Sequence, residues 1–377
     1  MICRISLNDY RFFGQRSDAE LDLVASRQTY LNDTLLRPCK GARLLRKCAI
    51  YGASGSGKTR YIEGIGRAMG KIRGDLDSDL VNFEFSIWFI YGSGDIYSYD
   101  FCINDGIVAL ETLTKHNPGS LTIIFKRDSD SISFSDGFAK KFNYWEQPPE
   151  DLLSKISKNR LLISYNYTED EDCEDGGIYF LSNIRDYLSR CVVVMSDKYS
   201  THCIESGVQG IFMGHYYKEI VNLANQYDFM IDWIGITECG RPGVLKHGDR
   251  CLTPFSSLSK GELALLNVLF GVSAPKATVF IDDFDSHLHP LVSEYLVRNI
   301  NYGNHACNQL VFTTNNLDHL ESGLFRRDEL CFFDKDKAVM GTGYPELISF
   351  SQFEGLNLKS DLRKMYALGR FRGTPKV

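Results

Sequence analysis

The 377-residue sequence lacks the patterns by which several large classes of protein are recognised. Its eleven cysteines include no Cys-x-x-Cys pair and are scattered singly along the chain. This predicts reduced, mostly buried thiols and argues against a disulfide framework. No segment approaches the roughly 20 consecutive apolar residues that a membrane-spanning helix needs. Long heptads, internal repeats and low-complexity tracts are also missing, which argues against a coiled-coil rod or a disordered chain.

Basic residues are also fewer than acidic ones. The chain carries 42 Lys and Arg against 48 Asp and Glu, a net charge of −6, whereas wrapping nucleic acid needs clustered cations in excess. Two basic runs remain, at residues 37–47 and 363–376, and solvated surface charge is the simpler explanation of both. The first residues alternate like a strand and do not form a signal peptide's apolar core. We therefore expect a soluble, cytoplasmic protein without a membrane partner.

The remaining composition, 44% hydrophobic and 24% charged, is that of a globular protein with room for two or three modules. Strand and helix patterns alternate near both ends of the chain, which indicates a parallel sheet. Between them, short aromatic-rich segments separated by regular turns indicate an antiparallel meander. The predicted fold class is α/β, with a mixed sheet that has a parallel core. We expect an N-terminal lobe at 1–75, an antiparallel β subdomain at 76–145, a mainly helical insertion at 146–250, a C-terminal lobe at 251–350 and a tail at 351–377.

The segment Gly52–Thr59 reads Gly-Ala-Ser-Gly-Ser-Gly-Lys-Thr and lies between a strand pattern and a helix pattern. It matches the phosphate-loop motif, in which backbone N–H groups surround phosphates, Lys58 reaches the β and γ oxygens and the Thr59 hydroxyl binds Mg²⁺. Glycine is needed because a side chain would block the approach of backbone to phosphate. The predicted nucleotide contacts in this segment are Gly52, Ser54, Gly55, Ser56, Gly57, Lys58, Thr59 and Arg60.

An apolar strand pattern at residues 278–281 ends in two carboxylates, Asp282 and Asp283. Taken alone, a buried strand followed by an acidic helix cap explains this pattern. Beside a phosphate loop, the same pattern is typical of a second nucleotide motif. Asp282 would then hold Mg²⁺ through water, and Asp283 would orient or deprotonate the attacking water.

The segment Ser257-Leu-Ser-Lys-Gly-Glu262 precedes this strand by about 20 residues. Ser259 and Glu262 have the spacing of a helix capping box. Leu-Ser-x-Gly-Glu is also the signature sequence of ABC-type ATPases. There the serine hydroxyl and the N–H groups of a helix N-terminus can bind the γ-phosphate held by the opposite subunit. The order of phosphate loop, long insertion, signature and double carboxylate fits no other common class of phosphate-loop protein as well.

With these motifs the chain resembles the compact ABC-type ATPases of the AAA_15 or abortive-infection family. These are relatives of the SMC, DNA-repair and OLD-family ATPases and include AriA-like antiphage-defence ATPases. The resemblance extends over most of the chain and is weakest between about residues 136 and 250. The segments that carry it besides the motifs above are Leu7–Phe13, Leu21–Ser26, Ile281–Pro290, Gln309–Asn315, Arg326–Asp328 and Tyr366–Pro375.

The resemblance also implies roles for residues outside the phosphate loop. It makes Arg11 a nucleotide contact, and Ser259, Lys260 and Gly261 groups that act in trans on another subunit's nucleotide. Asp285, followed by Ser286, belongs to the loop that couples two subunits. His287 and His289 form an H-x-H pattern that suggests a metal site. The coupling loop explains them better, because the sequence offers no third ligand nearby.

Two positions depart from the family pattern. Asp283 stands where the family usually has a catalytic Glu, and Asn315 stands where it usually has a switch His. The Asp side chain is one methylene shorter, and a misplacement of about 1 Å can lower a rate about 10²-fold. Asn carries no charge near neutral pH but still forms hydrogen bonds. With these as the two catalytic candidates, we expect slow ATP hydrolysis and largely preserved ATP and Mg²⁺ binding.

The function that the resemblance implies is antiphage defence by abortive infection. A homodimer or higher homo-oligomer would assemble around ATP, respond to a phage protein and control a separately encoded effector nuclease of TOPRIM or RloB type. The first alternative is an SMC- or OLD-like ATPase acting in DNA repair; DNA is the less favoured partner because the chain is acidic and lacks long heptads. The second alternative is the nucleotide-binding subunit of a membrane transporter.

Overall fold

The computed structural model describes the chain in thirteen stretches. These are residues 1–8, 13, 19–39, 41–75, 80–135, 137, 156–165, 176–195, 217–301, 308–320, 323–334, 345–353 and 361–371. Among them, no helix is long and apolar enough to cross a lipid bilayer. The eight cysteines in these stretches are free thiols, and four of them are buried.

The centre of the molecule is a six-stranded sheet. Its strands are, in spatial order, β16 (Glu346–Ser349), β15 (Leu330–Asp334), β3 (Lys47–Tyr51), β14 (Gln309–Thr313), β13 (Thr278–Ile281) and β9 (Cys191–Val194). The five strands from β15 to β9 run parallel, and β16 is antiparallel to β15. Every residue of β3, β13, β14 and β15 is buried, as expected for a parallel sheet covered on both faces. The prediction of a mixed sheet with a parallel core is confirmed.

A seven-stranded antiparallel sheet lies beside the central sheet. Its spatial order is β2 (Glu20–Asp22), β1 (Ile2–Asn8), β4 (Phe83–Tyr91), β5 (Asp95–Asn104), β6 (Ile107–Asn117), β7 (Ser120–Asp128) and β8 (Ile132–Phe134). Strands β4 to β8 form the predicted antiparallel meander. The sheet also includes β1, which pairs with β4, so it joins residues from both sides of position 76.

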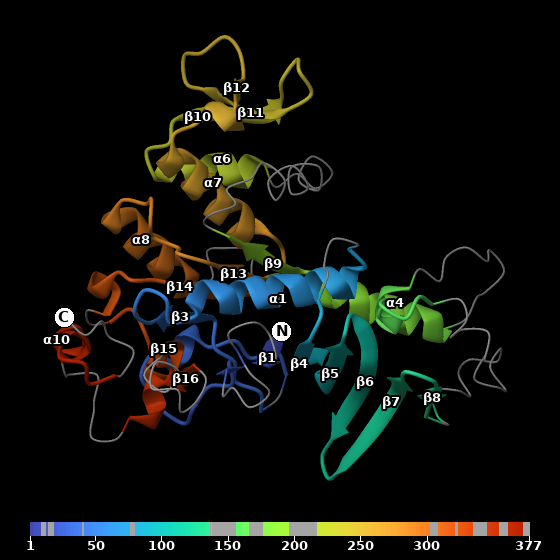
Figure 1. The fold of residues 1–377 in the computed structure, drawn as a ribbon. Helices are drawn as coiled ribbons and strands as arrows, with labels where there is room; N and C mark the ends of the chain where they lie inside the picture. The colour runs from blue at the N-terminus through green and yellow to red at the C-terminus, as the bar shows by residue number, and fades with distance from the viewer. Residues whose placement is uncertain are drawn as a thin grey trace.

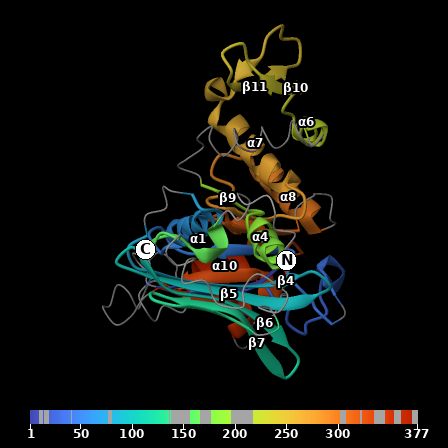
Figure 2. The same cartoon turned by 90° about the vertical axis from the view of Figure 1, so that its right-hand side faces the viewer.

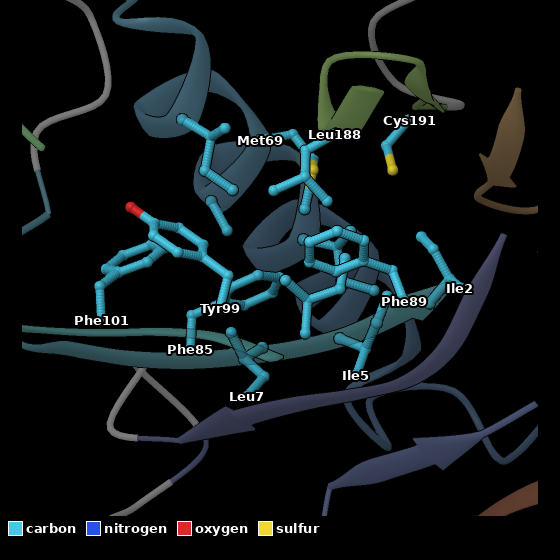
Figure 3. Packing of buried hydrophobic residues seen from close by; sticks show 14 of the residues in the cluster. Ile2, Ile5, Leu7, Met69, Phe85, Phe89, Tyr99, Phe101, Leu188 and Cys191 are labelled. Atoms are coloured by element: carbon cyan, nitrogen blue, oxygen red, sulfur yellow. The ribbon is translucent and has the colours of Figure 1, made fainter. Parts of the chain in front are cut away.

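Helix α1 (Lys58–Arg73) fills the space between the two sheets (Figures 1 and 3). Its fully buried apolar side chains Ile62, Ile65 and Met69 belong to one cluster with the inner face of the antiparallel sheet. Cys48 and Ile50 of β3 belong to the same cluster. Helix α4 (Gly176–Leu188) contributes to it as well. The helix that follows the phosphate loop is therefore held by both sheets at once.

The opposite face of the central sheet is covered by a second group of helices. These are α6 (Tyr217–Gln226), α7 (Lys260–Ser273), α8 (Pro290–Asn301) and α10 (Leu362–Ala367), and their apolar residues form a second core cluster. A small sheet of β10 (Ile231–Ile236), β11 (Pro242–Lys246) and β12 (Thr253–Pro254) lies beyond α6 and α7. Figures 1 and 2 show α6, α7 and this sheet as a lobe at one end of the molecule, remote from β6 and β7.

The described part of 146–250, expected to be mainly helical, contains strands as well as helices. Two helices, α4 and α6, alternate there with β9, β10 and β11. Strand β9 is Cys-Val-Val-Val and forms an edge of the central sheet against β13. Periodicity cannot distinguish an apolar run of four residues from part of a buried helix, so this strand gives no reliable sequence signal.

Gln309, the first residue of β14, bonds the central sheet to the antiparallel one. Its side-chain oxygen accepts from the backbone N–H of Ile2 (2.7 Å), and its amide nitrogen donates to the carbonyls of Ile2 (2.9 Å) and Leu45 (3.2 Å). Gln309 is 1% exposed. The amide group thus satisfies backbone groups that would otherwise be buried without partners.

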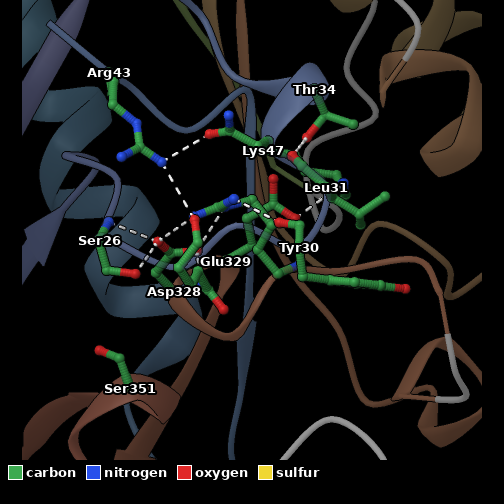
Figure 4. A network of polar contacts seen from close by, with 12 residues as sticks. Ser26, Tyr30, Leu31, Thr34, Arg43, Lys47, Asp328, Glu329 and Ser351 are labelled. Atoms are coloured by element: carbon green, nitrogen blue, oxygen red, sulfur yellow. Dashed lines mark hydrogen bonds and ion pairs between the residues drawn. The ribbon is translucent and has the colours of Figure 1, made fainter. Parts of the chain in front are cut away.

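A buried polar network ties residues 26–34 and β3 to the segment before β15 (Figure 4). The Arg326 guanidinium donates to Asp328 (2.9 and 3.0 Å) and to the carbonyl of Tyr30 (2.6 Å). Lys47 pairs with Glu329 at 3.0 Å, and both side chains are fully buried. Burial lowers the pKa of Lys47 and raises the pKa of Glu329, and each partner opposes the other's shift. Lys47, the last residue of the first basic run, therefore belongs to the core.

We predict that Lys47→Met destabilises the fold by about 3–5 kcal/mol, because it leaves the Glu329 carboxylate buried without its cation. Arg298→Met is the matched control, since it breaks the exposed Arg298–Glu294 pair and should change stability by about 1 kcal/mol or less. Urea unfolding of both variants measures the difference. Equal effects would show that burial of the Lys47 pair is unimportant.

A candidate nucleotide site at the carboxyl edge of the central sheet

The phosphate-loop strand β3 and the carboxylate strand β13 are separated by one strand, β14. Because all three are parallel, their carboxyl ends meet at one edge, with β3 and β13 about 10 Å apart. A cavity of about 570 Å³ opens there. The residues that line it are Ser54, Gly55, Ser56, Gly57, Lys58, Thr59, Arg60, Glu63, Met195, Asp282, Asp283, Thr313 and Asn315.

The phosphate loop forms one side of the cavity. Gly57 has a left-handed φ of 109° and precedes the first turn of α1, whose N-terminus has no side-chain cap. The N–H groups of that turn lack helical partners and favour an anion. The Ser56 hydroxyl is buried without a hydrogen-bond partner. Lys58 Nζ donates to the carbonyls of Gly52 and Ala53. An uncapped helix end, an unpartnered hydroxyl and a lysine at one loop fit the phosphate groups of a nucleotide.

Gly52 does not line the cavity, but it sets the shape of the loop. A Cβ at this position would lie 2.6 Å from Ser56 Oγ and 3.1 Å from the Cβ of Phe333. The loop closes so tightly over β15 that a methyl group at this position would have to displace the Ser56 side chain and shift the loop relative to Phe333. The contact between Gly52 and nucleotide stays a prediction, and the structure adds this packing role.

We predict that Gly52→Ala weakens ATP binding at least about tenfold, because the loop must shift to accommodate the new methyl group. Gly41→Ala is the control, since Gly41 also has a positive φ, 89°, but a Cβ there would meet nothing within 4 Å and the residue is outside the cavity. Titration with a fluorescent ATP analogue compares the two. Similar affinities for both variants would contradict the packing role.

Asp282 and Asp283 form the opposite side of the cavity. Asp282 is 2% exposed and its Oδ1 accepts from the Thr313 hydroxyl at 2.7 Å. Asp283 is half-buried and has a φ of 51°, in the left-handed region that costs a non-glycine residue about 1–3 kcal/mol. Burial, and next the charge of Asp285, raises the pKa of Asp283, while Lys58 opposes the shift. A higher pKa makes the ionised Asp283 a better proton acceptor.

Asn315 is exposed and lines the cavity from the segment that follows β14. Besides Thr313, two lining residues were not predicted from sequence, Glu63 and Met195. Glu63 lies one turn beyond Thr59 and accepts from Arg60 (2.7 Å) and Arg67 (3.2 Å). Arg60, predicted to contact nucleotide, lines the cavity with its guanidinium paired to Glu63. Met195 follows β9. The helical spacing from Thr59 to Glu63 is a signal by which sequence could have found Glu63, whereas Met195 has no such signal.

Arg11, which was predicted to contact nucleotide, is outside the described residues. The residues of the signature segment, Ser259, Lys260 and Gly261, lie apart from the cavity. Ser259 caps α7 in a complete capping box with Glu262, and both Ser259 and Lys260 are exposed. A Cβ on Gly261 would lie 3.2 Å from the carbonyl oxygen of His287, so the signature segment packs against the loop after β13. None of these residues lines the cavity of its own chain.

The loop after β13 contains Asp285, which is half-buried with an Oδ1 that has no hydrogen-bond partner. His287 and His289 are exposed, and the described residues contain no group of three side chains that could hold a metal ion. His319 was not singled out from sequence. It is 1% exposed, its Nε2 lies 3.0 Å from Ser293 Oγ, and burial lowers its pKa. It joins the segment after β14 to helix α8.

Comparison with known proteins gives one family match and several structural likenesses. Residues 244–317 match a family model described as "AAA domain, putative AbiEii toxin, Type IV TA system". The match includes the signature segment, both carboxylates and Asn315. It supports a phosphate-loop ATPase of the ABC type. It covers well under half of the chain and leaves the narrower AAA_15 resemblance as a prediction.

Among solved structures, the SMC head domain from Thermotoga maritima is 13% identical, with a TM-score of 0.40 and coverage of 92% of this chain and 98% of that one. An SMC head bound to the C-terminal winged-helix domain of ScpA is 12% identical, with a TM-score of 0.44 and coverage of 92% and 97%. These values are too low to transfer anything from the SMC heads to this chain. No curated protein matches the sequence.

Proposed function

We propose that the chain binds ATP with Mg²⁺ in the cavity at the carboxyl edge of the central sheet and hydrolyses it slowly. One observation carries the proposal: the phosphate loop, two carboxylates and Asn315, which lie far apart in the sequence, line a single cavity of about 570 Å³. The unpartnered Ser56 hydroxyl and the uncapped start of α1 fit phosphate. The Thr59 and Asp282 oxygens beside them are ligands of the kind that Mg²⁺ prefers.

Five side chains of the cavity have distinct roles in this proposal. Lys58 exchanges its carbonyl partners for the β and γ oxygens, and the N–H groups of the loop bind the phosphates. Thr59 and Asp282 would hold Mg²⁺, which neutralises charge that develops on the phosphoryl oxygens. Asp283 accepts the proton of the attacking water. Asn315 donates its amide hydrogens to the γ-phosphate and exchanges no proton.

We expect less than about one ATP per second from the purified protein, the low end of enzyme turnover numbers, with Lys58→Ala abolishing both binding and turnover. Mant-ATP binding and phosphate release measure the two steps. Turnover of tens of ATP per second would contradict the assignment of Asp283 and Asn315 as poor substitutes for Glu and His.

We further predict that Asp283→Glu raises kcat, by up to about 10²-fold, because the longer side chain brings the carboxylate closer to the water. Asp283→Asn should abolish turnover and leave ATP binding nearly unchanged. Single-turnover hydrolysis with both variants provides the comparison. A fall in kcat for Asp283→Glu would show that the site is shaped around the shorter carboxylate.

The proposal includes assembly of a homodimer or higher oligomer around ATP. Ser259, Lys260 and Gly261 lie at the start of α7, outside their own chain's cavity, and the first two are exposed. In a second copy they would face the γ-phosphate, and Asp285 would join the contact. ATP-dependent association in light scattering, lost in Ser259→Arg, tests this part.

We also propose a biological role for the ATPase. It would control a separately encoded effector nuclease in bacterial antiphage defence, with a phage protein as trigger. The motif resemblance supports it, and the matched family model is described as a putative AbiEii toxin of a type IV toxin–antitoxin system. The chain's own charged motifs are accounted for by ATP. Co-purification with the product of a neighbouring TOPRIM or RloB-like gene would support this role. ATP-stimulated, salt-dependent DNA binding would favour the SMC- or OLD-like alternative.

A further inference from the structure

Thr313, the last residue of β14, makes three short bonds to three consecutive residues of the acidic segment. Its hydroxyl lies 2.7 Å from Asp282 Oδ1 and 2.7 Å from the backbone nitrogen of Asp283. Its carbonyl accepts from the backbone N–H of Phe284 at 3.0 Å. Thr313 is 1% exposed and lines the cavity. One residue of the neighbouring strand therefore bonds all of positions 282–284.

The directions of these bonds follow from the chemistry of the groups. A hydroxyl has one proton to donate, and a carboxylate oxygen only accepts. The Thr313 hydroxyl therefore donates its proton to Asp282 Oδ1. A lone pair of the hydroxyl oxygen accepts from the backbone N–H of Asp283. The hydroxyl links the side chain of the predicted Mg²⁺ ligand to the backbone of the predicted base. Valine, which has the same shape, would make neither bond.

Asp283, whose backbone N–H donates to the Thr313 hydroxyl, has a strained backbone conformation. Asp283 has a φ of 51°, which a non-glycine residue keeps only where the surrounding structure holds it. The Thr313 hydroxyl on one side and the Phe284 bond to the Thr313 carbonyl on the other fix the peptide groups that flank this residue. The backbone conformation of Asp283 limits the directions that its carboxylate can take, because the side chain has only two rotatable bonds and the allowed χ1 rotamers depend on φ and ψ.

We infer that Thr313 is the positioning residue of this site: its hydroxyl orients Asp282 and holds Asp283 in the left-handed backbone conformation that aims its carboxylate into the cavity. The geometry alone supports the claim that Thr313 holds Asp282 and Asp283. The effect of Thr313 on catalysis rests on the proposed ATPase function. The threonine side chain need not contact ATP, and its loss should change kcat more than affinity.

Thr313→Val and Thr313→Ser test the inference, with Thr278→Val as the matched control. Thr278 begins β13 at the opposite end of the same strand pair, is 5% exposed and donates from its hydroxyl to Gln309 Oε1 at 3.1 Å. Each valine variant thus removes one buried hydroxyl between β13 and β14. Thermal unfolding with all three variants identifies any general loss of stability.

The first measurement is hydrogen–deuterium exchange of peptides that contain Asp283 and Phe284, in the full chain without nucleotide. Thr313→Val should speed exchange at Asp283 at least about tenfold, because its N–H loses its acceptor. Thr313→Ser and Thr278→Val should keep the wild-type rate. Unchanged exchange in Thr313→Val would overturn the inference, whatever the activity of the protein.

The second measurement is ATP hydrolysis. Thr313→Val should lower kcat about 10- to 100-fold with KM for ATP within about threefold, and Thr313→Ser should restore most of kcat. Equal losses in Thr313→Val and Thr278→Val, or no recovery in Thr313→Ser, would overturn the positioning role. Absence of ATP binding and turnover in the wild-type chain would instead contradict the proposed function, and the exchange result would still decide whether Thr313 holds Asp283.

Discussion

Parallel pairing of β3, β14 and β13 is the constraint on which the site depends. It brings β3 to the same edge of one sheet as β13 and β14, which lie more than 200 residues further along the chain, and the phosphate loop, the carboxylates and Asn315 follow these strands. Both faces of these strands are buried, one against α1 and the antiparallel sheet, the other against α7, α8 and α10. Because the strands cannot slide without exposing these faces to water, the distances across the cavity are fixed by the core.

Much of this site could be predicted from sequence because its parts lie in short contiguous motifs. Gly52–Thr59 follows β3 directly and runs into α1, and Thr278–Asp283 contains β13 and the two carboxylates that follow it, so local pattern sufficed. Glu63, Met195 and Thr313 were not predicted as site residues. Each lines the cavity only because of strand order or helix phase, and strand order is a property of long-range pairing that no local pattern contains. For Arg60 and Gly52 the motif identified the positions. It did not predict the ion pair of Arg60 with Glu63 or the close packing of Gly52 against Phe333.

The fold, like the site, was predicted where local sequence patterns suffice and missed where long-range pairing decides. The β4–β8 meander was predicted because its segments are short and rich in aromatic residues and its turns are marked by Gly, Asn or Asp. The pairing of β1 with β4 was not predicted, since it joins residues about 80 positions apart. Strand β9 is too short and too uniformly apolar to distinguish from a helix. Lys47 was assigned with surface cations because its partner, Glu329, is 282 residues away and only the folded chain shows that both side chains are buried together.

Strand β14 is bonded at both ends to parts of the molecule with different tasks. Its first residue, Gln309, bonds the backbone of Ile2 in the antiparallel sheet, and its last, Thr313, bonds the carboxylate of Asp282 and the backbone N–H of Asp283. Five extended residues span only about 17 Å and resist stretching. A force that moves β1 would therefore move β14 as a unit and change the position of Thr313 at its other end. A shift of the β1–β2 edge of the antiparallel sheet would thus move Gln309, β14 and Thr313 together, and with them the segment that carries Asp282 and Asp283.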